Sequence, residues 1–499
     1  MGDAVELPPG EILVGGEWRT GRGAEVRPIN PLDCSPLGEL RGADEADVRL
    51  AVERGAAAAA DPAWRDLLPH QRAPYLVRIA DAMEARAERL ARLQTLNTGK
   101  SILETRALVA SAVGTMRYFA SVCETWDDDL TAPRGDYLTL SVQEPIGVIG
   151  AINAWNSPIA SDAQKIAPAL AAGNAVVVKP AEWTPWVSLE LGRIITETGL
   201  PDGLLSVLPG PGRVVGAALM ADPGIGKIVF TGGTETGRRL ATQAGERLLP
   251  ISLELGGKSP VVILDDADVD AAVAGVMYGV FSSSGQSCIA GSRVFVPRHL
   301  HDDFVARLVG ATARLRLGDG LDERTQVGPL VHPAHRATVA SFVDLAREEG
   351  AVVECGGRAG VVDAHPDGAF YEPTVLTGLG DGAEVVRQEI FGPVVVVLPY
   401  DDEDELVARA NDSGFGLAAG IWSRSFPRAW RLARRLQAGT VWVNTYKQFS
   451  ISTPFGGVKD SGLGREKGRQ ALAAYSQQKG VFVGLSETPM PWAEVRSDD

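Results

Sequence analysis

The sequence predicts an α/β fold: a doubly wound parallel sheet, a second α/β domain and a small β flap. Between residues 145 and 255, short segments rich in Val and Ile alternate with segments of helical periodicity. This alternation is typical of right-handed βαβ units. A second alternation runs from 259 to 444. A chain of 499 residues is also too long for one hydrophobic core, so two or three domains are expected.

The elements follow in a regular order. Turns and short strands are predicted over 12–31, then helices over 43–60 and 78–99, with glycines at or after the ends of these helices expected to act as stops. Strands of the first sheet are predicted at 145–153, 175–179, 204–208, 227–232 and 250–255. The helices between them are predicted at 161–172, 185–199, 214–220 and 235–245. Segments 136–142 and 480–483 also have strand character.

Composition narrows the class of protein. The formal net charge of −15 argues against nucleic acid and anionic membranes as partners. The first ten residues, MGDAVELPPG, lack the basic start and apolar run of a signal peptide. No apolar run reaches the roughly 18 residues of a transmembrane helix. A cytoplasmic protein is therefore expected.

The chain has 4 cysteines, Cys34, Cys123, Cys288 and Cys355. They lie far apart and form no CxxC pair, so neither a disulfide framework nor a metal site is expected. Cys288 stands in a loop of small and hydroxyl residues, VFSSSGQSCIAGSR. By itself this loop leaves two interpretations open, core filler or nucleophile.

Polar residues and glycines follow the predicted strands of the first unit, where ligands of open parallel sheets bind. They are Ala154-Trp155-Asn156, Lys179 to Glu182, Thr231 to Gly237, and Glu254 to Lys258. A glycine turn before a helix suits a pyrophosphate, although a tight turn without a ligand fits equally well. Glu182 could accept ribose hydroxyls or be a solvated acid. These features together predict a binding edge.

Several stretches then resemble the aldehyde dehydrogenase superfamily, in the order of that family and over nearly the whole chain. They are AWNSPI, GNAVVVKPAEWTP, GLPDGLLSVLPG, FTGGTETG, LELGGKSPVVILDDAD, GQSCIAGSR, EIFGPV and PFGGVKDSGLGRE. The resemblance implies a hydrolytic, NAD-dependent dehydrogenase, with NADP possible. It assigns catalytic roles to Cys288 as nucleophile, Glu254 as general base, Asn156 as oxyanion donor, and Lys165.

The chemistry explains these residue types. A thiolate adds to the aldehyde carbon, and amide donors stabilise the resulting oxyanion. The adduct loses hydride to NAD and becomes a thioester, which a carboxylate-activated water hydrolyses. By resemblance, the cofactor contacts are Ile152, Asn153, Ala154, Trp155, Lys179, Ala181, Glu182, Gly212, Gly216, Phe230, Thr231, Gly232, Gly233, Leu255, Gly256, Glu389 and Phe391.

The expected substrate pocket is unusually polar. By the same resemblance it consists of Ser111, Ser157, Ser161, Gln164, Ser287, Ile289, Phe449 and Phe455. Ser157 stands where the family often has Phe, while Gly233 replaces a frequent Ser and Ser283 a frequent Asn. Hydroxyl and amide groups would be left unpaired around an alkyl chain, so a polar aldehyde or semialdehyde is predicted. The serines could instead bond their own helix carbonyls. No arginine aligns with the pocket, which weighs against an acidic semialdehyde.

Two other functions remain as alternatives. An acylating enzyme would pass the thioester to coenzyme A, but such relatives typically lack the base that Glu254 supplies. A non-catalytic protein would have no reason to keep Asn156, Glu254 and Cys288 together. The resemblance also implies a homodimer or homotetramer. The expected domains are 1–126 with 146–256 for the dinucleotide, 257–456 for catalysis, and 127–145 with 470–490 as oligomerisation strands.

Overall fold

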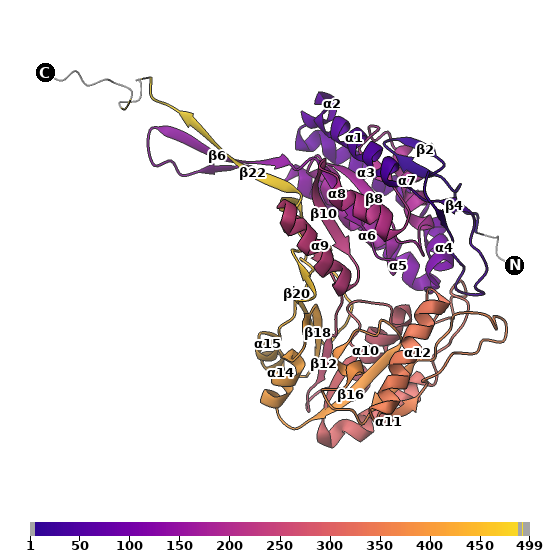
Figure 1. Cartoon of the computed structure of the whole chain (residues 1–499). Helices are drawn as coiled ribbons and strands as arrows, with labels where there is room; N and C mark the ends of the chain where they lie inside the picture. Colours follow the sequence, from indigo (N-terminus) through magenta and orange to yellow (C-terminus); the bar gives the residue numbers. More distant parts are fainter. Residues whose placement is uncertain (1–4, 488–491, 493–499) are drawn as a thin grey trace.

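The structure is a computed structural model that describes residues 5–487 and 492. Residues 1–4 and residues 488–490 of the predicted oligomerisation segment lie outside the described residues. Two α/β lobes lie one beside the other, and a narrow β arm projects from the first (Figure 1). The predicted fold class is therefore confirmed.

The first lobe is built on an eight-stranded sheet. In spatial order its strands are β2 (Glu17–Arg19), β1 (Ile12–Val14), β9 (Leu205–Val207), β8 (Ala175–Lys179), β7 (Val148–Ile152), β10 (Ile225–Thr231), β11 (Ile251–Glu254) and β21 (Gly462–Leu463). The five strands from β9 to β11 are parallel. Their order reverses between β7 and β10, the arrangement of doubly wound dinucleotide-binding sheets. The switch point lies between the ends of β7 and β10.

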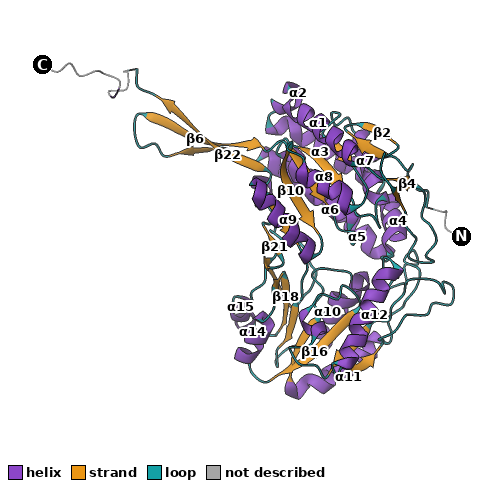
Figure 2. Cartoon of the chain, in the orientation of Figure 1, coloured by secondary structure: helices purple, strands orange, loops and turns teal. Residues whose placement is uncertain are grey.

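Helices cover this sheet (Figure 2). They are α1 (Glu45–Ala60), α2 (Pro62–Arg65), α3 (Pro69–Ala85), α4 (Ala87–Thr98), α5 (Ile102–Glu124), α6 (Pro158–Ala171), α7 (Trp186–Thr196), α8 (Ala217–Ala221), α9 (Thr234–Arg247) and α16 (Gln470–Ala473). Gly99 ends α4 at a φ of 78°, as predicted. Gly55 lies within α1, which continues through it. A Cβ there would lie 3.4 Å from that of Ala175 on β8, so Gly55 allows close helix–sheet packing.

The second lobe has a seven-stranded sheet. Its order is β14 (Val352–Cys355), β15 (Thr374–Thr377), β16 (Val394–Tyr400), β13 (Arg293–Pro297), β12 (Pro260–Ile263), β18 (Ala418–Trp422) and β19 (Thr440–Val443), parallel except for β14. The helices of this lobe are α10 (Val269–Phe281), α11 (His301–Thr312), α12 (Pro333–Glu348), α13 (Glu384–Arg387), α14 (Glu403–Asn411) and α15 (Phe426–Ala433). Separate apolar clusters cover the two faces of the sheet.

The arm is a three-stranded antiparallel sheet of β22 (Ser476–Gly484), β6 (Tyr137–Pro145) and β5 (Asp129–Thr131). Two-stranded ladders join β3 (Glu25–Val26) to β4 (Leu40–Arg41) and β17 (Phe415–Gly416) to β20 (Val458–Lys459). Among residues 5–487 and 492, no helix combines the length and apolar character needed to cross a membrane.

Candidate active site

A strained loop after α10 carries Cys288. Ser283 and Ser284 have φ values of 59° and 54°, a conformation that is uncommon for residues with a side chain. Glu104, in the first turn of α5, holds the loop: its carboxylate accepts bonds from the Ser283 amide at 2.5 Å and hydroxyl at 3.1 Å. Gly285 has a φ of +72°, and a Cβ there would lie 2.0 Å from the Gly392 carbonyl. The first lobe thus fixes the loop of the predicted nucleophile.

Asn156 lies against the same loop. Its side-chain NH₂ donates to the backbone carbonyl of Gln286 at 3.1 Å, two residues before Cys288. The Gln286 side chain in turn accepts from the Val331 amide at 2.8 Å. An amide group that follows β7 is thereby held beside the cysteine loop. A second N–H of Asn156 remains for an oxyanion.

Glu254 ends β11, directly beside Thr231 at the end of β10. It is 6% exposed, and one of its carboxylate oxygens has no hydrogen-bond partner. Burial, and then the charge of Glu466, raise the pKa of Glu254 well above its ordinary value. Lys165 on α6 lies 3.0 Å from Glu466 and donates to Thr231 Oγ1 at 2.8 Å. The predicted base therefore belongs to a buried cluster of ionisable groups.

Glu466 was not identified from the sequence, although it ends the stretch PFGGVKDSGLGRE. It lies 301 positions from its ion-pair partner Lys165 (466 − 165), and no local pattern connects them. Only the return of β21 alongside β11 brings this segment to Glu254.

The thiol of Cys288 is half-buried, and its pKa is raised to about 12. Burial is the main cause, followed by the charges of Glu389 and Glu254, while Lys447 acts in the opposite direction. Burial also raises the pKa of Glu389 to about 7. Without an added positive charge, the thiol is protonated at neutral pH.

Glu389 and Phe391 extend from the second lobe toward the sheet edge of the first. The Glu389 carboxylate accepts from the Gly257 amide at 3.0 Å. It also lies so close to Gly256 that a Cβ there would be 2.4 Å from a carboxylate oxygen. Phe391 has a φ of 57°, and its ring lies 5.1 Å from that of Trp155. These two predicted cofactor residues thus meet the strand-end segments of the first lobe.

A cavity of about 690 Å³ lies at the switch point between β7 and β10. Most of the predicted cofactor residues line it: Ile152, Asn153, Ala154, Trp155, Lys179, Ala181, Glu182, Gly212, Gly216, Phe230, Thr231, Gly232 and Gly233. Leu255, Gly256, Glu389 and Phe391 do not line it, although Phe391 packs on Trp155, which does. The lining residues missed from the sequence are Trp183, Arg213, Ala217, Thr236, Arg239, Leu240 and Gln243. The last four follow helical spacing along α9, a signal that could have identified them.

The donor groups of this cavity fit a dinucleotide. Glu182 accepts from the Gly212 amide at 2.9 Å, which fixes a carboxylate where ribose hydroxyls can donate to it. Burial lowers the pKa of the neighbouring Lys179 to about 8. A Cβ on Gly233, at the N-terminus of α9, would have no atom within 4 Å. This open helix N-terminus suits a phosphate.

The predicted substrate residues lie on several elements. Ser111 is on α5, Ser157 precedes α6, and Ser161 and Gln164 are on α6. The rings of Phe449 and Phe455 lie 5.4 Å apart, edge to face. A Cβ on Gly114 would lie 2.8 Å from the Ile451 side chain, so α5 packs on the loop between these rings.

The hydroxyls of the four predicted pocket serines do not bond helix carbonyls, which was the alternative to a role in the pocket. In the part of the chain that the structure describes, none of Ser111, Ser157, Ser161 and Ser287 donates its hydroxyl to a protein acceptor. This contrasts with Thr115 on the same helix, whose hydroxyl donates to the Ser111 carbonyl at 2.8 Å. The protein therefore engages none of these four hydroxyls as a donor.

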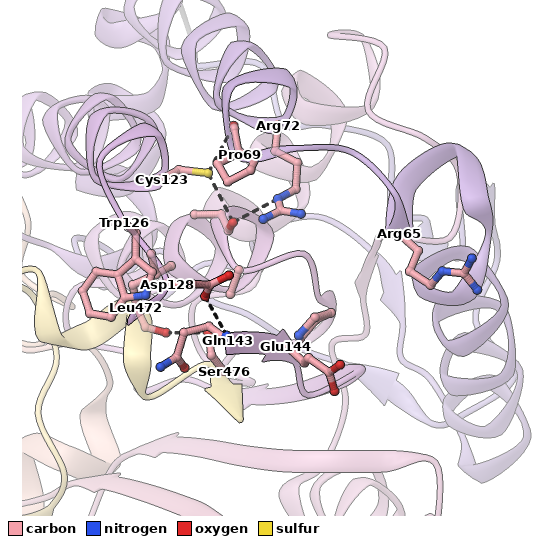
Figure 3. Close-up of a pocket in the computed structure, with 13 residues that line it drawn as sticks. Arg65, Pro69, Arg72, Cys123, Trp126, Asp128, Gln143, Glu144, Leu472 and Ser476 are labelled. Carbon is pink, nitrogen blue, oxygen red and sulfur yellow. Dashed lines mark hydrogen bonds between the residues drawn. The ribbon is translucent and has the colours of Figure 1, made fainter. Parts of the chain in front are cut away.

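A second cavity, of about 570 Å³, lies at the base of the β arm (Figure 3). Cys123 faces it, but burial raises the pKa of this thiol, and its Sγ contacts the Ala171 carbonyl at 3.4 Å. Asp128 accepts from the Gln143 amide at 2.9 Å and links β6 to the segment before β5. None of the predicted catalytic residues lines this cavity.

The fold and the site define a two-lobed oxidoreductase, with a cavity where the strand order of one lobe reverses and a cysteine loop in the other lobe. The aldehyde dehydrogenase family model matches residues 18–481, and the chain belongs to this family. The family and enzyme class predicted from the sequence are confirmed.

Named relatives are similar over nearly their whole length. The betaine aldehyde dehydrogenase of Mesorhizobium japonicum is 44% identical over 94% of this chain and 96% of its own. An NAD⁺ complex of an aldehyde dehydrogenase from Bacillus cereus is 36% identical, with a TM-score of 0.93 over 97% of this chain and 100% of its own. Betaine aldehyde dehydrogenase from Staphylococcus aureus with NAD⁺ is 34% identical, with a TM-score of 0.95 over 97% of this chain and 96% of its own.

Proposed function

We propose that this chain oxidises a polar aldehyde to a carboxylate with NAD, through a thiohemiacetal and then a thioester on Cys288. The observation that carries the proposal is the Asn156–Gln286 bond, because it places an amide donor of one lobe against the cysteine loop of the other. The relatives named above, two of which were solved with NAD⁺, support the reaction class.

In this mechanism the Cys288 thiolate adds to the aldehyde carbon, and the Asn156 N–H stabilises the oxyanion. The bound cofactor supplies the hydride acceptor and a positive charge near the thiol. Glu254 then takes a proton from water during hydrolysis of the thioester. Lys165 and Glu466 set the charge around Glu254 and connect it to Thr231.

Glu182 supports a preference for NAD over NADP. Its carboxylate is fixed by the Gly212 amide at the cavity that we assign to the adenosine ribose. A 2′-phosphate there would meet a negative charge.

The decisive experiment is NADH absorbance with a panel of aldehydes, with and without coenzyme A, together with identification of the product. The proposal predicts NADH and a free carboxylate without coenzyme A. Turnover that requires coenzyme A and yields an acyl thioester would establish the acylating alternative. No turnover with any aldehyde would overturn the dehydrogenase proposal.

We also propose the domain division 1–126 with 146–256, 257–456, and 127–145 with 470–490, which the three main sheets support. The arm would pair between subunits of a homodimer or homotetramer. Leu130 and Phe482 on the arm are 68% and 71% exposed, and no strand among residues 5–487 pairs with the outer edge of β19. A monomer mass by light scattering at micromolar concentration would contradict this.

Four free cysteines fit a reducing compartment such as the cytoplasm.

A further inference from the structure

A buried lysine covers the two rings of the predicted substrate pocket. The Lys467 ammonium lies 3.8 Å from the centre of the Phe449 ring and 5.6 Å from that of Phe455. Lys467 is only 6% exposed. The next residue of this segment, Gly468, donates its amide to Ile451, which lies between the two rings in sequence. A positive charge is therefore built into the wall of the pocket.

Two more lysines lie on the cysteine loop side of the same pocket. Lys447 precedes Phe449 closely in sequence, and its ammonium donates to the Ser282 hydroxyl at 2.8 Å. Lys100 is 3% exposed and lies just before α5. The thiol of Cys288 interacts electrostatically with Lys100, Lys447 and Lys467.

Nearby carboxylates act on these lysines electrostatically: Glu104 on Lys100 and Lys447, and Glu466 and Glu254 on Lys467. Glu466 is paired with Lys165. Glu104 accepts bonds from the amides and hydroxyls of Ser101 and Ser283. Across the described ranges, neither Lys447 nor Lys467 forms an ion pair with a carboxylate. A buried ammonium without a counter-ion is unfavourable, and an anion that binds beside it relieves that cost.

We propose that this pocket recognises an aldehyde that carries a carboxylate, with Lys467 and Lys447 as the residues that determine specificity. The inference rests on the proposed dehydrogenase function and adds the sign of the substrate's charge. No arginine of the sequence aligns with this pocket. Lysine carries the same charge on a single ammonium group, in place of the planar guanidinium of arginine.

A quaternary ammonium aldehyde fits this pocket poorly, although several relatives are named for betaine aldehyde. Aromatic faces bind such cations, but Lys467 already occupies the faces of Phe449 and Phe455. A second cation there would be repelled by Lys467 and by Lys447. Ser157 and Gln164, also predicted for the pocket, add hydrogen-bonding groups and no further aromatic ring.

The protonation of these lysines gives the proposal a pH signature. Burial lowers the pKa of Lys467 to about 8 and that of Lys447 to about 7. Glu466, Glu254 and the Cys288 thiolate raise the pKa of Lys467 and so oppose the effect of burial. Glu104 and the Cys288 thiolate raise the pKa of Lys447 in the same way, whereas the charge of Lys100 lowers it further. Because only the protonated ammonium attracts an anion, kcat/KM for a carboxylate-bearing aldehyde should fall above about pH 8 relative to a neutral one.

The test compares three aldehydes of similar length: succinic semialdehyde, its methyl ester and betaine aldehyde. We expect kcat/KM to favour the carboxylate over the ester by about tenfold or more, since a hydrogen bond to a charged group contributes on this scale. Lys467→Met and Lys447→Met should each reduce this preference severalfold, measured as the ratio of kcat/KM for the carboxylate to kcat/KM for the ester within one variant, so that an effect on Cys288 common to both substrates cancels. Lys467→Arg should keep the preference.

Lys459→Met is the matched control. This exposed lysine donates to the carbonyls of Asn411 and Ser413, and its loss should leave all three rates unchanged. Equal rates for the carboxylate and the ester, or a preference for betaine aldehyde, would overturn the charge assignment while the dehydrogenase proposal stands. Absence of NADH with all three aldehydes, and with the wider panel, would overturn the dehydrogenase proposal itself.

Discussion

The Lys165 ammonium lies 3.0 Å from a carboxylate oxygen of Glu466, and both side chains are buried close to Glu254. The pair has opposite effects on the predicted base: Glu466 raises the pKa of Glu254, whereas Lys165 lowers it. The pH dependence of hydrolysis should therefore respond to a residue that touches neither the substrate nor the cofactor.

Replacement of Glu466 with Gln should lower the pKa of Glu254. The substitution removes the charge that raises this pKa and leaves Lys165, Arg465 and Lys467 to lower it. Glu254 acts as a base only when it has lost its proton, so the acidic limb of the kcat profile should move to lower pH, by roughly one unit. Steady-state NADH formation across pH measures the shift.

The control for this change is Glu197→Gln, which removes a carboxylate paired with Arg86 on the surface. Its profile should match that of the wild type. An acidic limb that stays in place in Glu466→Gln would show that Glu466 does not act on the base.

Alkylation of Cys288 should depend on NAD⁺. The pKa of about 12 means that the thiol is protonated at neutral pH, and a nearby positive charge would lower this pKa. Labelling by iodoacetamide at pH 7, followed by peptide mass spectrometry, should be severalfold faster with NAD⁺. Cys34, which lies elsewhere, should label equally in both conditions.

Cys288→Ala provides the companion measurement. It should abolish aldehyde oxidation while NAD⁺ affinity by calorimetry persists. Turnover within about tenfold of the wild type would refute the nucleophile assignment, since loss of a nucleophile typically costs far more.

Glu182→Gln should weaken the discrimination against NADP. The amide keeps an acceptor for ribose hydroxyls but removes the charge that opposes a 2′-phosphate. The ratio of kcat/KM for NADP to that for NAD should rise about tenfold, because a change of about 1.4 kcal/mol in binding free energy alters a rate ratio by that factor. Equal ratios in wild type and variant would show that Glu182 does not determine cofactor choice.

Local patterns were sufficient for the fold class, and together with the family resemblance they named most of the residues that line the cavity of about 690 Å³. The Val- and Ile-rich strands and the residues that follow them indicated the sheet edge, and Lys179, Glu182 and Gly233 line the cavity there. Four cavity residues on α9 were not predicted, although they follow helical spacing: Thr236, Arg239, Leu240 and Gln243.

The charge around the cysteine could not be predicted locally. Lys447, Lys467 and Glu466 come from loops near the C-terminus, and each meets partners far away in sequence: Ser282, Cys288 and Lys165. Whether a lysine is solvated or buried depends on these long-range contacts, and no spacing rule reports them.

The most direct test of the central claim is mass spectrometry of Glu254→Gln after mixing with NAD⁺ and an oxidisable aldehyde. Without its base, the enzyme should form the thioester but hydrolyse it slowly, so NADH should appear in a burst and the Cys288 peptide should carry the acyl mass. No adduct should form without NAD⁺. Sustained formation of NADH with an unmodified Cys288 would contradict the account.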